Sequence, residues 1–317
     1  MAKNNLAGTI KKILTNENAS DKESACDNKV SENNDASDIA LKNNVLSENI
    51  NVVYGQTNKN LLIKDHFHNS LEMIYVVDGS AEFEINNKFY TVTKNNIVLI
   101  SNLETHSLKV LSYPYRRYFI LIKPEYFKSA ITEPEMASIF IHRPEHFRHV
   151  LELREENQQN IQNIIKNIHN EVNTKNDYWE VNIKSYLQLL FVDLYRNYKN
   201  AFPLSELSDV TKTIIEIQRY VDAHYLEPLS FKDICRKYFV SMYYISHNFK
   251  KVTGYSFRDY VILQRISKAK DLLFYTDDDI MQVGISSGFY NVNNFIRTFK
   301  KYTGITPYQY RKKFKFL

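Results

Sequence analysis

Two nearly identical hexapeptides, each with a pair of adjacent lysines, occur in the last third of the chain. FKKVTG occupies residues 249–254 and FKKYTG residues 299–304. Residues 207–317 carry 18 Lys and Arg against 10 Asp and Glu, whereas the rest of the chain carries 23 against 26. Cations concentrated in this way can follow a polyanion such as a nucleic acid. Many solvated helices are also basic, so the elements around the lysines must decide between the two interpretations.

The first hexapeptide ends a pattern of two short helices. Ser230 is expected to cap a helix that carries Ile234, the chain breaks at 239–240, and Ser241 caps a second helix that ends at Gly254. The inner face of the second helix is apolar and comprises Ile245, Phe249 and Val252. Its outer face carries Met242, Tyr243, Ser246, His247 and Lys250.

The second hexapeptide repeats this pattern. Residues 279–285 predict a short helix, 287–289 a turn, and Asn291 the cap of a helix that ends at Gly304. Phe295 and Phe299 point inward in this prediction, while the outward side chains are polar, namely Asn293, Asn294, Arg297 and Lys300. Two short helices joined by a tight turn, the second of them amphipathic, are typical of a helix-turn-helix.

A long amphipathic segment, 256–275, joins the two patterns. Its apolar residues are Ile262, Ile266, Ala269, Leu272 and Leu273. Nearly twenty helical residues span roughly 30 Å, and successive major grooves on one face of B-DNA lie about 34 Å apart. A rigid helix of this length could therefore hold two recognition helices about one DNA turn apart.

The first half of the chain changes in character along its length. Residues 1–46 lack aromatic residues and are rich in Asn, Ser, Asp, Glu and Lys, so we expect a disordered tail. Residues 47–123 contain short strand patterns: 71–77, ending at an Asp78-Gly79 turn; 83–85 and 88–92, joined across Asn86-Asn87; 97–100; and 118–122. Such spacing predicts a small antiparallel barrel or jelly roll.

Residues 124–205 are expected to be helical. An apolar stripe at helical spacing contains Ile161, Ile164, Ile165, Ile168 and Val172. The segment 178–198 is apolar on nearly every side, which favours packing on the barrel and against a second copy of the chain; an internal core helix is the alternative. The predicted fold class is α+β and multidomain, with a cupin-like barrel, a helical linker and an all-α domain at 207–317.

Other signals bound the class of protein. The apolar runs are too short to span a bilayer, and we find no secretory signal pattern. Cys26 and Cys235 give no disulfide or metal spacing. We therefore expect a cytoplasmic protein without a membrane partner.

The last hundred residues resemble the AraC family of bacterial transcription regulators. The resemblance rests on Ser241, Ile245-x3-Phe249-Lys250, Gln264-Arg265-Ile266-x2-Ala269-x2-Leu272-Leu273, Gly288-Phe289, Phe295-x-Arg297-x-Phe299-Lys300 and Gly304-Ile-Thr-Pro307-x2-Tyr310-Arg311. One departure is Gly284-Ile285, where the family more often has Ile-Ala. The resemblance implies promoter DNA as partner, with base contacts from Tyr243, Ser246, His247, Asn293, Asn294 and Arg297 and phosphate contacts from Lys250, Lys251, Lys300 and Lys301; Asn291 is a further candidate DNA-binding residue.

The front domain resembles the cupin-like sensor barrels of the same family. His66-x-His68-x3-Glu72-x6-Gly79 is similar to the first cupin motif, and His106 stands where the second motif has its histidine. In metal-dependent cupins these four positions hold a divalent cation; Zn, Fe, Mn and Ni suit such ligands about equally. Asn60 and residues 101–103 depart from the motifs, and sensor barrels of the family generally bind small molecules without metal. Three interpretations of these residues therefore stay open: a metal site, a polar pocket for a small-molecule ligand, and histidines with a purely structural role.

Two further groups of residues leave alternatives open. Phe67, Tyr75, Phe83 and Tyr90 would suit the face of a sugar effector or an ordinary core. His142, His146 and His149 form a histidine-rich stretch around Pro144, which we expect to be a surface loop entering a helix.

We therefore predict that the chain is a dimeric, ligand-responsive transcription regulator and not an enzyme. A small molecule in the barrel would shift the dimer between arrangements on DNA. The alternatives are a metal sensor and a metal-dependent cupin enzyme tethered to DNA, which only the set of His66, His68, Glu72 and His106 supports.

Overall fold

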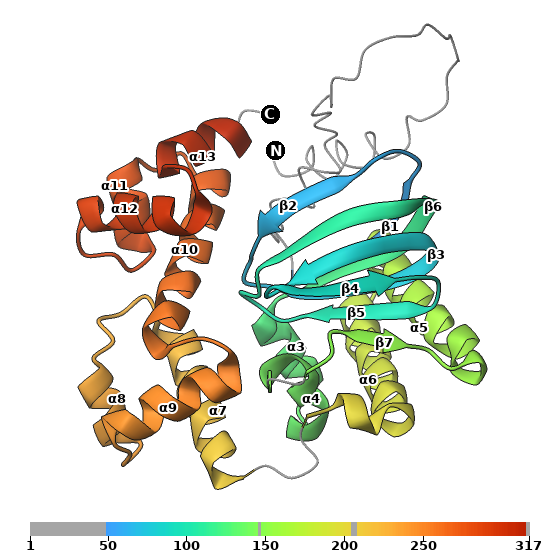
Figure 1. Ribbon diagram of the computed structural model, residues 1–317, viewed down its shortest axis with the longest axis horizontal. Coiled ribbons are helices and arrows are strands. Elements are labelled where there is room, and N and C mark those ends of the chain that lie inside the picture. The colour runs from blue at the N-terminus through green and yellow to red at the C-terminus, as the bar shows by residue number, and fades with distance from the viewer. Residues whose placement is uncertain (1–48, 145–146, 204–207, 315–317) are drawn as a thin grey trace, which may run out of the picture. The chain divides into compact units, whose positions relative to one another are not determined.

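The computed structural model describes residues 49–144, 147–203 and 208–314. The tail expected at residues 1–46 lies outside these ranges. Seven strands form one antiparallel sheet in the order β1-β6-β3-β5-β7, with β2 paired to β6 and β4 paired to β3 (Figure 1). The strands are β1 (Ile50–Thr57), β2 (Leu62–His66), β3 (Leu71–Ile85), β4 (Lys88–Val92), β5 (Asn96–Ile100), β6 (His106–Ile122) and β7 (Val150–Glu152).

The predicted turn at Asp78-Gly79 is wrong, because β3 runs through these residues without ending. Its pairing with β6 shifts register on both sides of Asp78, which marks a local irregularity and not a reversal of the chain. Gly79 has φ of +76°, and a Cβ there would lie 2.5 Å from the carbonyl oxygen of Pro114. Glycine is therefore needed for a bend within a long strand.

The Asn86-Asn87 hairpin is confirmed. Both residues have positive φ, 48° and 64°, and they join β3 to β4 with Ile85 opposite Lys88. Asparagine tolerates this left-handed conformation, so two successive asparagines form the tight reversal that the strands need.

Helices α3 (Pro124–Ala130) and α4 (Pro134–Ile141) lie between β6 and β7, and α5 (Glu155–Thr174), α6 (Trp179–Asn197) and a 3-10 turn η1 (Lys199–Ala201) follow β7. Figure 1 shows α5 and α6 side by side next to the strands. The predicted stripe from Ile161 to Val172 is confirmed, since all five residues are buried in the core shared with the sheet. On α6, Ile183, Leu187 and Leu190 join this core, whereas Val181 and Leu189 are exposed.

The remaining helices are α7 (Asp209–His224), α8 (Phe231–Lys237), α9 (Met242–Thr253), α10 (Phe257–Tyr275), α11 (Ile280–Ser286), α12 (Val292–Thr303) and α13 (Pro307–Phe314). They enclose a second core around Ile245, Phe249, Ile266, Phe295 and Phe299, all fully buried. Phe67 and Leu103, which lie on loops of the sheet, belong to this core as well. In the described ranges no helix is both long and apolar enough to cross a membrane.

Candidate DNA-binding helices and effector site

The first candidate recognition helix, α9, has the predicted cap and the predicted end. The Ser241 side chain accepts a hydrogen bond from the Tyr244 backbone N–H, and Gly254 follows the helix with φ of +82°. Ile245, Phe249 and Val252 are buried, so the helix presents its polar face to solvent. On that face the rings of Tyr243 and His247 are nearly parallel with centroids 5.9 Å apart.

The second candidate, α12, repeats the same construction. The Asn291 side chain accepts from the Asn294 backbone N–H, and Gly304 follows the helix with φ of +79°. Phe295 and Phe299 are fully buried against α11 and α13. The outer face again holds the residues that the sequence places there, and all of them are exposed: Asn291, Asn293, Asn294, Arg297, Lys300 and Lys301.

The unusual Gly284 has a packing reason in this structure. A Cβ at this position on α11 would lie 3.0 Å from Cδ1 of Phe295. The ring of Phe295 therefore packs directly on the α11 backbone. An alanine at this position would require α11 and α12, the two helices of the second helix-turn-helix, to move apart.

Helix α10 connects the first helix-turn-helix, α8 and α9, to the second, α11 and α12, and polar contacts hold it against α7. Tyr260 Oη donates to Asp222 Oδ1 at 2.6 Å, and Gln264 Nε2 donates to the same oxygen at 2.9 Å. Arg265 Nε donates to the Tyr225 carbonyl at 2.7 Å. These contacts hold α10 against α7 and the residue that follows it.

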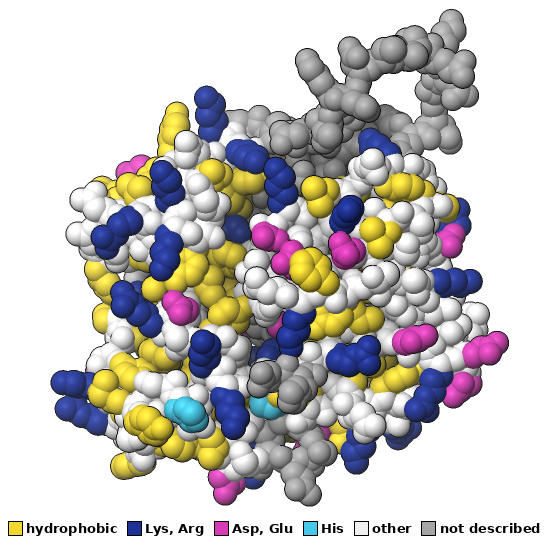
Figure 2. Space-filling model, viewed as in Figure 1, with side chains coloured by type: hydrophobic (Ala, Val, Ile, Leu, Met, Phe, Trp, Pro, Cys, Tyr) yellow, Lys and Arg dark blue, Asp and Glu magenta, His cyan; other side chains and the backbone are white. Residues whose placement is uncertain are grey.

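The surface of the helical region is rich in basic side chains. Figure 2 shows Lys and Arg side chains over the surface formed by α8 to α13, with fewer acidic ones among them.

The candidate effector site is separate from the recognition helices. It is a buried cluster of His66, His68, Glu72 and His106 at one end of the sheet, called the His cluster below. His66 ends β2 and lies opposite His106 in the β2–β6 ladder, while Glu72 lies at the start of β3. One ring nitrogen from each of the three histidines lies within 4.8 Å of the other two. His68, Glu72 and His106 are 2–4% exposed, and His66 is half-buried.

Hydrogen bonds orient the rings of this cluster. His66 Nδ1 donates to the Lys64 carbonyl at 3.0 Å, and His106 Nδ1 donates to the Glu104 carbonyl at 2.9 Å. His68 Nδ1 accepts from the Ser70 N–H at 3.3 Å, so its Nε2–H donates to Glu72 Oε2 at 3.0 Å. His106 Nε2 lies 3.3 Å from that same oxygen.

Burial and mutual charge shift the acidities of the cluster in opposite directions. Burial, together with the neighbouring histidines, lowers the pKa of His66, and burial lowers the pKa of His68 to about 4. Burial raises the pKa of Glu72, but His106 and the hydrogen bonds from His106 and His68 outweigh it and hold that pKa well below its usual range. Burial lowers the pKa of His106, but the Glu72 carboxylate outweighs it and raises that pKa overall. Proximity to Glu72 thus favours a positive charge in the cluster.

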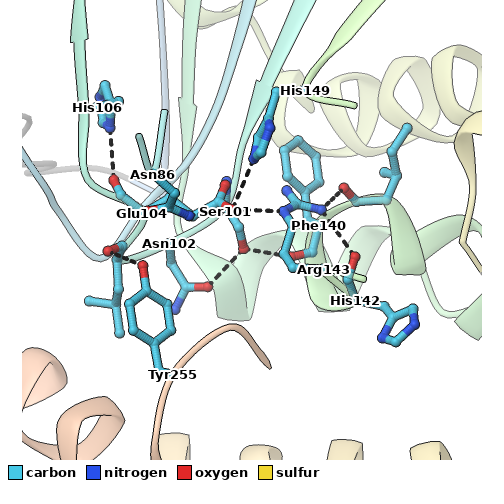
Figure 3. Close-up of polar contacts among 12 residues, drawn as sticks. Asn86, Ser101, Asn102, Glu104, His106, Phe140, His142, Arg143, His149 and Tyr255 are labelled. Carbon is cyan, nitrogen blue, oxygen red and sulfur yellow. Dashed lines mark hydrogen bonds and ion pairs between the residues drawn. The ribbon is translucent and has the colours of Figure 1, made fainter. Parts of the chain in front are cut away.

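A second buried polar group, which sequence reasoning missed, surrounds Glu104 (Figure 3). Glu104 Oε1 accepts from Arg143 Nε at 3.1 Å and from His149 Nε2 at 3.0 Å, and Oε2 accepts from the Ser101 N–H at 2.6 Å. Burial raises the pKa of Glu104, but Arg143 and the hydrogen bonds more than offset this and lower it to about 2. The only sequence signal was the histidine-rich stretch.

The prediction for that stretch was wrong at His149. Its side chain is 4% exposed, its carbonyl accepts from the Leu99 N–H, and the chain then enters strand β7, not a helix. Pairing with β5 covers the residue, and Glu104 supplies a buried partner for its ring. His146 lies outside the described residues.

The aromatic residues proposed for a sugar face belong mostly to the core. Tyr75 and Phe83 are 1% and 0% exposed, and Phe67 is 6% exposed in the core of the helical region. Tyr90 is half-buried, and its Oη lies 3.0 Å from His149 Nδ1.

The loops that carry the His cluster also contact the helices of the second core. Lys270 Nζ on α10 donates to the Phe67 carbonyl at 2.7 Å and lies 4.6 Å from the centre of the Phe67 ring. Tyr255 Oη donates to the Leu103 carbonyl at 2.6 Å, and Figure 3 shows Tyr255 beside the loop of Asn102 and Glu104. Burial lowers the pKa of Lys270 to about 8. Sequence reasoning did not foresee these contacts.

Comparisons with known proteins match both halves of the chain. Residues 52–191 match the AraC-like ligand binding domain, and residues 234–313 match a helix-turn-helix domain. The HTH-type transcriptional regulator YdiP of Escherichia coli is 26% identical over 263 residues, which cover 79% of this chain and 81% of that protein. YdeC of Bacillus subtilis, another HTH-type transcriptional regulator, is 24% identical over 266 residues, which cover 80% and 88%.

Solved structures agree on the fold. ToxT from Vibrio cholerae superposes with a TM-score of 0.56 at 18% identity, covering 84% of this chain and 98% of ToxT. Another ToxT structure contains a bound unsaturated fatty acid. The sheet and the helices that follow it thus recur together in a solved structure. With both regions matched in order, the chain belongs to the AraC family of transcription regulators, with a ligand-binding domain followed by a DNA-binding domain.

Proposed function

We propose that α9 and α12 enter two successive major grooves of promoter DNA. The observation that carries this proposal is the repeated construction of the two helices, each with a side-chain cap, a closing glycine, a buried apolar face and an exposed polar face. Helix α10 has 19 residues and therefore spans about 28 Å, close to the groove repeat of about 34 Å. It would hold the two helices on one face of the duplex.

The exposed side chains divide into two roles. Arg297 can donate two hydrogen bonds to guanine, and Asn293 and Asn294 can each pair with adenine. The other proposed base contacts are Tyr243, Ser246 and His247, and Asn291 is a further proposed DNA contact. The lysines in the last turn of each helix, Lys250, Lys251, Lys300 and Lys301, would contact phosphates and supply affinity without sequence information.

We propose that the effector binds at His66, His68, Glu72 and His106. What supports this is the position of the cluster, whose own loops contact Lys270 and Tyr255 of the DNA-binding domain. An effector with different affinity for two arrangements of these loops would shift the DNA-binding domain between them. The fatty acid in ToxT is consistent with a small-molecule effector in this fold, but the buried polar cluster here calls for a different ligand chemistry.

We propose further that regions 47–123, 124–205 and 207–317 serve sensing, dimerisation and DNA binding. A homodimer through α6 is supported by its exposed apolar residues, since Val181 is 59% and Leu189 56% exposed. A dimer would select duplexes that contain two copies of the paired contact blocks, whereas a monomer would select duplexes that contain one copy. The sequences of the selected duplexes therefore test the proposed homodimer. The related regulators support a regulator that acts in the cytoplasm and not an enzyme.

Substitution of Arg297 by alanine is expected to weaken specific DNA binding by roughly 1–3 kcal/mol and to relax one base position. Lys250→Ala should instead weaken binding to all sequences alike and lower the salt dependence by about one unit of slope. Both follow from the exposed positions of these residues on the two helices. Fluorescence anisotropy with specific and scrambled duplexes over a salt series measures both effects.

The matched control is Lys166→Ala, which removes an exposed lysine from α5 of the ligand-binding domain. Its affinity and salt slope should equal those of the wild type. Equal affinities for all three variants would mean that α9 and α12 do not contact DNA.

A further inference from the structure

Three large apolar side chains are exposed where the first recognition helix begins. Phe239, in the turn between α8 and α9, is 96% exposed, and Met242 and Tyr243 in the first turn of α9 are 49% and 78% exposed. We call these three residues the apolar tip. Because they leave their apolar area in water, they contribute little to the core of this chain. Exposed apolar groups gathered within residues 239–243 mark a surface that contacts another molecule.

The backbone of Phe239 adopts a conformation that suits glycine better. Its φ is +52°, in the left-handed region, which costs a bulky residue conformational strain. In the second helix-turn-helix the matching position, the second residue after the short helix, is Gly288 with φ of +88°. The first helix-turn-helix thus carries a strained aromatic residue whose ring lies almost wholly in solvent. This combination favours a role in binding for the ring, since glycine would serve the fold.

The two recognition helices offer different chemistry at matching positions. Met242 and Tyr243 follow the cap of α9 as Val292 and Asn293 follow the cap of α12. An exposed asparagine can form two hydrogen bonds with adenine, whereas a thioether and a phenol ring cannot form such a pair. The apolar group that base pairs present in the major groove is the C5-methyl of thymine. The apolar tip therefore matches thymine, as the polar face of α12 matches guanine and adenine.

The charges around the apolar tip favour DNA over a protein as the occupant. Residues 231–254 carry five Lys and Arg against one Asp. Arg236 and Lys237 precede the tip, Lys250 and Lys251 follow it, and all four are exposed. In a duplex the methyl groups lie in a groove between two phosphate backbones, so apolar contacts flanked by cations complement it.

We propose that Phe239, Met242 and Tyr243 bind the C5-methyl groups of thymine, so that the DNA block under α9 is selected for thymine. The inference rests on the proposed entry of α9 into the major groove, and it adds a base identity and two residues, Phe239 and Met242, to that proposal. The first residues of a recognition helix are those that contact base edges. Burying one methyl group against the apolar tip contributes about fourfold in affinity.

The test replaces thymine by uracil, which keeps every hydrogen-bonding group of the base edge and lacks only the methyl. Full-length protein first selects duplexes from random DNA. The block that loses a base preference with Arg297→Ala is assigned to α12, and the other block to α9. The selected duplex is then synthesised with deoxyuridine in place of one thymine at a time. We expect a loss of about fourfold in affinity for at least one thymine of the α9 block.

Two variants show whether the apolar tip makes the lost contact. Phe239→Gly and Met242→Ala should each bind the thymine duplex about fourfold more weakly than the wild type does, and one uracil substitution should then cost each of them less than about twofold. Phe239→Gly should unfold at about the temperature of the wild type, because the strain that glycine relieves offsets the chain entropy that it adds. Phe89→Ala is the matched control, since Phe89 is 66% exposed on β4 of the ligand-binding domain. Its affinity and its response to uracil should equal those of the wild type.

A selected α9 block without thymine would overturn the proposal, as would full affinity for every uracil duplex or a uracil effect that both variants leave unchanged. Variants that bind both duplexes like the wild type but do not support transcription by RNA polymerase would assign the apolar tip to a protein partner instead. Selection of no duplex would contradict the proposed DNA contacts themselves, whereas selection with any of the results above overturns only the thymine contact.

Discussion

Replacing Phe299 by alanine is expected to lower the free energy of unfolding of the second helix-turn-helix unit by about 3–5 kcal/mol. The side chain is fully buried, and its ring centre lies 5.7 Å from that of Phe295 and 5.5 Å from that of Tyr310. Truncation removes apolar area and leaves a cavity between α12 and α13 that neighbouring rings can fill only partly. Specific DNA binding through α12 should fall with it.

Hydrogen exchange followed by mass spectrometry measures this loss in the full-length protein, because it reports α11 to α13 separately from the rest. Tyr308→Ala is the control, since Tyr308 is 67% exposed on α13 and its removal should cost less than about 0.5 kcal/mol. If the two variants exchange alike, Phe299 does not support the recognition helix.

The second large effect is expected for Arg143→Met in the ligand-binding domain. Arg143 donates to Glu104 and to the Ile139 carbonyl, and its guanidinium lies 4.0 Å from the centre of the Phe147 ring. Both members of the ion pair are at most 9% exposed. Removing one partner leaves a buried carboxylate without its main compensating charge, which should cost about 3–5 kcal/mol at pH 7.

The cost of this substitution should depend on pH. The lowered pKa of Glu104 means that its ionised contacts stabilise the fold above pH 4.5 and are lost as the pH falls toward 2. Without Arg143 the pKa of the carboxyl should rise, so the difference between wild type and variant should shrink below about pH 4.5. Urea denaturation followed by the fluorescence of Trp179, the single tryptophan, on α6, measures both values.

A surface ion pair provides the control for Arg143. Arg116 lies 3.4 Å from Asp78 with both side chains about 40–45% exposed, so Arg116→Met should cost only about 0–1 kcal/mol. A cost for Arg143→Met no greater than this, at any pH, would show that the buried pair does not hold the loop of Glu104.

Local signals in the sequence predicted the DNA-binding helices well. The three predicted caps, Ser230, Ser241 and Asn291, each cap the helix that follows, and Gly254 and Gly304 each follow a helix with positive φ. Caps and closing glycines act within a few residues, so single-sequence reasoning can read them. Whether the exposed polar residues contact DNA stays a prediction.

The missed features depend on partners that are distant in the sequence. Asp78-Gly79 has the composition of a turn, but β6 is long enough to pair with β3 on both sides of it. Lys270 meets Phe67 across 203 residues, and Tyr255 meets Leu103 across 152. Buried charges such as Arg143 carry no local signature, because their burial depends on a partner that the tertiary fold supplies.

The central claim is that the chain reads two blocks of DNA with two recognition helices. The most direct test is selection of bound duplexes from random DNA by the full-length protein at stated salt. Enrichment of sites with two contact blocks about one helical turn apart is the predicted result, and paired copies of such sites would indicate a dimer. Enrichment of a single short block, or of no sequence, would contradict it.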